Sequence, residues 1–168
     1  MPQCYRKEGV EAAPTPKAIV SVVAGIVDAF VEENKLTEIE ACYSGSEVIE
    51  TDLAAALKAA EAKDWMGAIA HLKDVAAEIP AALSNCKMGD DISAIKTWAK
   101  IFKDETKLEE IITKNLIMHK AKITDDIQTI KTDYTAEKYF DCGKAIGDAL
   151  ILALGPVHLS HPKAAEFL

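Results

Sequence analysis

Residues 65–83, WMGAIAHLKDVAAEIPAAL, contain the most regular apolar pattern in the chain. Its apolar side chains recur at alternating spacings of four and three residues: Trp65, Ile69, Leu72, Ala76, Ile79 and Leu83. This spacing places them on one face of an α-helix, and it is typical of a helix that packs against a core. Pro80 lies inside the pattern and removes one helical hydrogen bond, so we predict a bend between residues 78 and 81.

Helical periodicity also recurs on both sides of this segment, over most of the chain. It covers segments 18–34, 46–63, 90–102, 106–134 and 139–154, and a short helix is expected around Ile39 and Cys42. No segment alternates polar and apolar residues with β-branched enrichment, so no sheet is predicted. The fold class that follows is all-α, a single-domain bundle of about five to six helices stapled by disulfides.

The ends of the bundle are marked by residues that stop helices. Pro14-Thr15-Pro16 closes an N-terminal arm, residues 1–16, and Gly155-Pro156 ends the last helix. We therefore predict a helical bundle domain over residues 17–156 and a C-terminal tail over residues 157–168. Within the bundle, Thr106-x-x-Glu109 is a candidate capping box for the longest helix.

Composition excludes several functional classes. The chain has 27 acidic and 19 basic residues and a formal charge of −8, with no cluster of Lys and Arg interleaved with aromatic residues. Nucleic-acid binding is therefore disfavoured, because phosphate neutralisation needs clustered positive charge. No stretch reaches the roughly 18 to 20 apolar residues of a membrane span. We interpret the excess of acidic over basic residues as an aid to solubility.

The chain lacks the sequence signals of a catalytic or metal centre. No G-x-S-x-G elbow, H-E-x-x-H motif or C-x-x-C pair occurs. We expect no catalytic residue, no metal and no cofactor, and so no enzymatic activity. An enzyme whose site is assembled from scattered residues is kept as an alternative.

A few residues are candidates for binding or close packing. His119 occupies an apolar position of the long helix, where a hydrogen-bonded histidine at the core or its edge is preferred over a metal ligand. If the bundle encloses a cavity, its expected wall residues are Trp98, Phe102, His119 and Phe140. Gly143 and Gly147 lie on one helix face, where they would allow an Ala-rich helix to approach closely.

The four cysteines, Cys4, Cys42, Cys86 and Cys142, are widely spaced. An even number at long spacings suits two disulfides, for which three connectivities are open. The alternative is four buried free thiols in a cytosolic protein. Residues 1–7 lack the apolar segment of a signal peptide, so either the protein is cytoplasmic or a leader has been removed.

Several short segments together resemble a known group of proteins. They are Cys42 with the charged Ala-rich helix after it, Ala81-Ala82-Leu83-x-x-Cys86, Lys114-Asn115-Leu116, Asp133-Tyr134 and Tyr139-Phe140-x-x-Gly143-Lys144-x-Ile146-Gly147. Over roughly residues 25 to 152, the chain resembles small secreted helical proteins of unknown function that are predicted in ciliates and other protists. The resemblance implies a secreted or luminal protein in which Cys42 and Cys86 are the shared pair. Cys4 and Cys142 would be additions and a second candidate pair.

These observations favour a non-enzymatic protein that is secreted, luminal or on the cell surface. Its expected role is structural, through self-assembly, or interaction with another protein, with no nucleic acid and no membrane span. The alternative is a carrier of a lipid or another apolar ligand inside the bundle. Alanine-rich helices pack tightly, and this favours the interaction role over a roomy cavity.

Overall fold

The computed structural model describes residues 16–88 and 90–157, and in this part of the chain the secondary structure consists of seven α-helices without a strand. The helices are α1 (Pro16–Val31), α2 (Leu36–Cys42), α3 (Glu47–Glu61), α4 (Trp65–Ala82), α5 (Asp90–Ile101), α6 (Glu105–Thr135) and α7 (Tyr139–Leu154). The predicted all-α class is confirmed, with more helices than the five to six expected. The predicted arm and tail, apart from Pro16 and Val157, lie outside the described residues.

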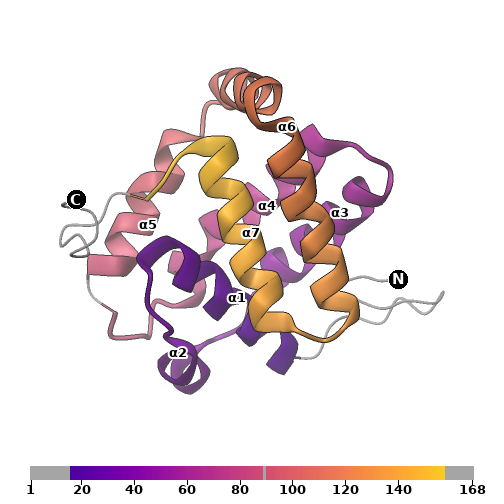
Figure 1. Ribbon diagram of the computed structural model, residues 1–168. Helices are drawn as coiled ribbons and strands as arrows, with labels where there is room; N and C mark the ends of the chain where they lie inside the picture. Colours follow the sequence, from indigo (N-terminus) through magenta and orange to yellow (C-terminus); the bar gives the residue numbers. More distant parts are fainter. Residues whose placement is uncertain (1–15, 89, 158–168) are drawn as a thin grey trace, which may run out of the picture.

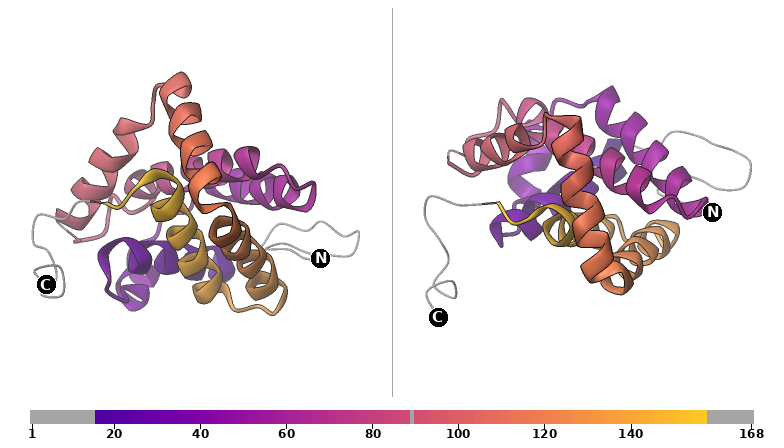
Figure 2. Two further views of the ribbon diagram at one scale, coloured as in Figure 1. Left: turned by 45° about the horizontal axis from the view of Figure 1, so that its top comes forward. Right: turned by 90° about the horizontal axis from the view of Figure 1, so that it is seen from above.

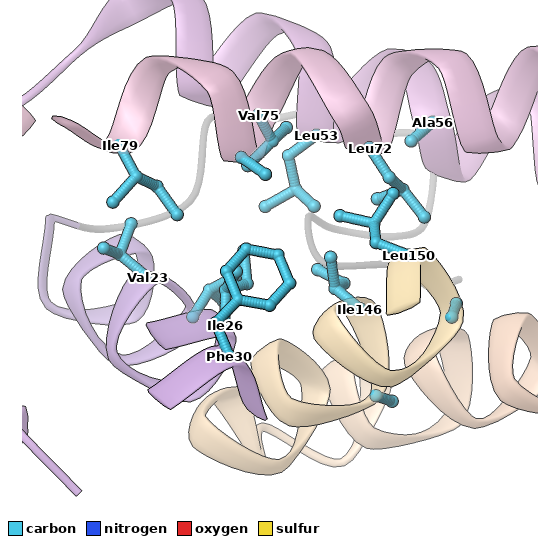
Figure 3. Close-up of a cluster of buried hydrophobic side chains, with 14 of the residues drawn as sticks. Val23, Ile26, Phe30, Leu53, Ala56, Leu72, Val75, Ile79, Ile146 and Leu150 are labelled. Carbon is cyan, nitrogen blue, oxygen red and sulfur yellow. The ribbon is translucent and has the colours of Figure 1, made fainter. Parts of the chain in front are cut away.

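The helices are arranged around one apolar core. In Figure 1, α7 runs between α1 and the second half of α6, and α3 and α4 form an antiparallel pair behind them. Figure 3 shows side chains from α1, α3, α4 and α7 pointing into one interior, and all of these are nearly inaccessible to solvent: Val23, Ile26, Phe30, Leu53, Ala56, Leu72, Val75, Ile79, Ile146 and Leu150. The apolar positions that gave the helical periodicity thus form the core.

α1 and α7 approach each other unusually closely. A Cβ atom at Gly143 of α7 would overlap the carbonyl oxygen of Val22 and lie 2.9 Å from the Cα of Gly25, both in α1. A Cβ atom at Gly147 would overlap the Cβ of Ala29. The two glycines for which close packing was predicted therefore face α1, and their missing side chains allow the contact.

Two local expectations differ from the structure. α6 is interrupted at His119, where φ is −129° and ψ is 26°. By contrast, α4 continues through Pro80 as one helix, and the bend between residues 78 and 81 stays a prediction. α6 is also capped by a residue outside the predicted box. The carboxylate of Asp104 accepts hydrogen bonds from the backbone N–H groups of Thr106 and Lys107, at 3.0 and 3.2 Å.

The bundle is stapled by a disulfide between Cys42, the last residue of α2, and Cys86 in the loop after α4. Among the helices in residues 16–88 and 90–157, none is both long enough and apolar enough to cross a bilayer.

Candidate functional site

The interruption at His119 divides α6 into two halves with different surroundings. The second half contributes five of the seven buried residues of α6, among them Ile123, Ile127 and Ile130, and it runs alongside α7. The first half has only Leu108 and Ile112 buried. Figure 2 (left) shows this first half, together with the end of α5, projecting from the body of the bundle. The projection exposes much of the first half of α6 to solvent.

The projecting half carries two adjacent exposed apolar side chains. Ile117 is 79% exposed and Met118 is 62% exposed, and the only other large apolar side chain so exposed in the described residues is Val48 of α3. Both line a shallow surface depression, which we call the α6 face, together with Thr106, Glu109, Glu110, Thr113 and Lys114. The α6 face therefore combines an exposed apolar pair with a charged rim.

A second depression lies on the other side of the interruption, between α6 and α7. We call it the α6–α7 groove, and its lining comprises His119, Lys122, Asp126, Asp148, Ile151 and Leu152. Asp126 is only 7% exposed, and its carboxylate accepts a hydrogen bond from the Lys122 ammonium at 2.8 Å. The groove thus has an ion pair at one side and the aliphatic side chains of Ile151 and Leu152 at the other.

Desolvation and charges in the α6–α7 groove shift two pKa values. Asp148 is an exposed residue, but partial burial of its carboxyl group raises its pKa, and the nearby negative charge of Asp126 raises it further. The hydrogen bond to Asp126 raises the pKa of Lys122. The groove therefore contains a carboxyl group that ionises less readily than usual beside a stabilised ammonium group. The charged side chains that line the groove can attract a charged ligand. The lining residues include no Ser or Cys that would act as a nucleophile.

The end of α7 is held by two side chains from elsewhere in the bundle. The Asn115 side-chain amide donates to the carbonyl oxygen of Ala153 at 2.6 Å, and the Trp98 indole N–H donates to that of Gly155 at 2.9 Å. The last carbonyl groups of a helix lack hydrogen-bond donors within the helix. The Asn115 and Trp98 side chains provide donors to two of these carbonyl groups at the end of α7. Asn115 thereby attaches the projecting half of α6 to the body of the bundle.

The four residues proposed to line a cavity lie in three separate surroundings. Trp98 and Phe102 stack edge to face, with ring centroids 5.0 Å apart, and both are buried in the core. Phe140 is half-buried and lines a surface depression with Tyr139 and Ala18. His119 lines the α6–α7 groove instead. Lipid binding by these four residues together therefore stays a prediction without a shared cavity to support it.

The cysteines can be placed in part. Cys42 and Cys86 form the disulfide, with their Cα atoms 5.3 Å apart, and this is the pair that the resemblance implied. Cys142 is buried in α7, whereas Cys4 lies outside the described residues. The second pair, Cys4 and Cys142, stays a prediction.

The α6 face was missed by the sequence reasoning, although a signal for it existed. Leu116, Ile117 and Met118 are consecutive, and three consecutive residues on a helix point in directions about 100° apart. At most one or two of them can therefore face a single core, and at least one must be exposed. His119 also occupies an apolar position of this helix, so the periodicity alone does not single out the two residues before it.

Comparison with known proteins gives one match. The model of a protein family described as SctB-like, Secreted protein B-like, matches residues 13–153. The match extends from α1 through α6 and over nearly all of α7. Neither a curated protein nor a solved structure matches the chain.

Proposed function

The chain belongs to the SctB-like family, Secreted protein B-like, and from this premise we propose that it is a non-enzymatic extracellular protein that associates with a second copy of itself through the α6 face. The disulfide between Cys42 and Cys86 supports an oxidising compartment, because such bonds persist outside the cytosol. That the protein comes from a ciliate or another protist is part of the same proposal. It rests only on the resemblance to small secreted helical proteins of those organisms.

The observation that carries the proposal is the exposure of Ile117 and Met118. Each is a large apolar side chain that contacts water over most of its surface, at a free-energy cost of about 25 cal/mol per Å² that burial would recover. They are adjacent and on the part of α6 that projects from the bundle (Figure 2). A projecting helix can meet a partner without hindrance from the rest of the chain.

The charges of the α6 face favour a second copy as the partner. Glu109 and Glu110 lie toward the start of α6, and Lys114 lies one turn further along. If two copies of the helix pack antiparallel around a two-fold axis, Glu110 of each copy meets Lys114 of the other. The same symmetry repeats each contact, as in most homodimers. In this arrangement the apolar pair of one copy lies opposite Thr106 and Lys107 of the other copy, further along the helix than the ion pairs.

Oligomeric state tests this proposal. We expect wild-type protein to associate in a concentration-dependent manner in sedimentation velocity, and Ile117→Glu to shift the midpoint at least about tenfold upward, since a buried unpaired charge is costly. Val48→Glu is the matched control, because Val48 is also an exposed apolar side chain, 46% exposed, but belongs to α3. It should leave association unchanged.

A charge exchange tests the antiparallel arrangement. Glu110→Lys and Lys114→Glu should each weaken association, and the double variant should restore it, because the exchanged charges again face opposite charges. A monomer at all concentrations, or equal effects of Ile117→Glu and Val48→Glu, would contradict self-association. A co-purifying lipid detected by native mass spectrometry of the monomer would favour the carrier alternative instead.

A further inference from the structure

The helical hairpin of α3 and α4 carries a cluster of three metal-ligating side chains, none of which belongs to the α6 face. Asp52 of α3 and His71 and Asp74 of α4 each offer one ligand atom, and these atoms all lie within 4.8 Å of one another. We propose that these three side chains bind a divalent transition-metal ion of the Zn²⁺ type. This differs from the sequence expectation that the chain has no metal site.

The backbone holds the three positions in place. His71 and Asp74 are three residues apart on α4, so their side chains leave the helix on the same face. Leu53 and Leu72, the chain neighbours of Asp52 and His71, are buried in the core between α3 and α4 (Figure 3). The core packing of these neighbours therefore fixes the separation of the two helices at the level of the site.

The distances are compatible with a small ion. The Nδ1 atom of His71 lies 3.1 Å from the Oδ1 atom of Asp52, close to the edge of about 3.3 Å in a tetrahedron whose metal–ligand bonds are about 2.0–2.1 Å. Asp74 has a side chain 45% exposed, so it can rotate toward the other two. The side chain of His71 is 42% exposed, which leaves an open coordination position toward solvent.

The ligand set selects the class of ion. One imidazole nitrogen and two carboxylate oxygens suit Zn²⁺ and its neighbours, whereas Ca²⁺ and Mg²⁺ prefer oxygen ligands alone. Without an ion, the same atoms form a hydrogen bond between His71 and Asp52. The experiment must therefore separate a metal site from a simple hydrogen-bonded pair.

A substitution at Lys73 distinguishes a metal site from a hydrogen-bonded pair. Its ammonium nitrogen lies 2.6 Å from the Oδ1 atom of Asp74, so it competes with a cation for this carboxylate. Removing the ammonium charge with Lys73→Met should strengthen Zn²⁺ binding about tenfold, because a like charge near the ion is lost. A merely structural pair of His71 and Asp52 would give no such gain.

Isothermal titration of EDTA-treated full-length protein with ZnCl2, and separately with CaCl2, tests the site. We expect one Zn²⁺ per chain and much weaker Ca²⁺ binding. His71→Ala and Asp74→Asn should each raise the Kd for Zn²⁺ at least about tenfold, as loss of metal-site groups commonly does. Asp74 is exposed enough that Asp74→Asn should leave the circular dichroism spectrum unchanged.

Two controls address other histidines of the chain. His119→Ala removes a histidine of α6, and the double variant His158→Ala/His161→Ala removes those near the C-terminus. Both should leave the Kd for Zn²⁺ unchanged. The proposal is overturned if wild-type protein does not bind Zn²⁺, if binding survives His71→Ala, if only the C-terminal double variant loses it, or if Lys73→Met fails to strengthen it.

Discussion

Asp148 shows how single residues of the α6–α7 groove couple folding to pH. Its pKa is raised above the ordinary value of 3.8, first by burial and then by the charge of Asp126. A carboxyl group with a raised pKa in the folded state contributes stability below its ordinary pKa, and this contribution is lost as the pH rises through the folded value. At a pH above the folded pKa, ionisation of Asp148 therefore lowers the free energy of unfolding.

Asp148→Asn should stabilise the protein at pH 7, because it removes a charge that burial and Asp126 disfavour. Surface substitutions change stability by up to about 0.5 kcal/mol, so we expect Tm to rise by about 1–2 °C. The gain should shrink at pH 3, where the wild-type carboxyl is largely protonated. Asp125→Asn removes a charge from α6 at a position that does not line the α6–α7 groove, and it serves as the control for charge removal in calorimetry. An equal gain at both pH values would contradict this account.

At the scale of elements, the contact between α1 and α7 depends on glycine backbones. Gly143→Ala should destabilise the protein by about 1–3 kcal/mol, the usual range for overpacking, because its Cβ would meet backbone atoms of Val22 and Gly25 that cannot move alone. Chemical denaturation followed by circular dichroism measures the change. An unchanged free energy of unfolding would show that α1 and α7 are farther apart than described.

Gly147 offers a matched comparison at the same contact. A Cβ atom added there meets chiefly the Cβ of Ala29, which is a side-chain atom and can be removed. Ala29→Gly should therefore rescue part of the loss caused by Gly147→Ala, and it should rescue none of the loss caused by Gly143→Ala. The coupling energy from a double-mutant cycle decides between these outcomes.

The elements differ in how far sequence could predict them. Helix positions follow from local periodicity, and α4 and α7 were predicted almost to the residue, the latter because Gly155 adopts a φ of 112° that ends the helix. The interruption at His119 could not be predicted from sequence, because α6 contains no Pro or Gly that would indicate a break. It separates two halves of α6 that differ in burial. The trio of Asp52, His71 and Asp74 depends on how α3 packs against α4, which no local pattern reveals.

For the whole molecule, the two proposed sites lie in regions that are far apart in sequence. The projecting half of α6 carries exposed apolar side chains, and the hairpin of α3 and α4 carries the candidate metal ligands. The core consists mostly of small and aliphatic side chains, with a few aromatic ones such as Phe30, and α1, α3, α4 and α7 all contribute to it (Figure 3).

The disulfide gives the whole molecule a stability that depends on its compartment. Cys42 and Cys86 are 44 residues apart, and closing a loop of this length contributes about 4 kcal/mol in the chain-entropy model. The double variant Cys42→Ala/Cys86→Ala should lose about this much in free energy of unfolding, measured by urea denaturation. Because the variant removes only this bond, any bridge that involves Cys4 or Cys142 is left in place.

Thiol titration of freshly isolated, denatured protein under non-reducing conditions completes the test. An extracellular protein with Cys42 and Cys86 bonded can present at most the other two of its four cysteines as thiols. Four reactive thiols would indicate a reducing compartment and would contradict secretion, because oxidised pairs do not persist in the cytosol. A double variant as stable as the wild type would show that this bond does not stabilise the bundle, whichever compartment holds it.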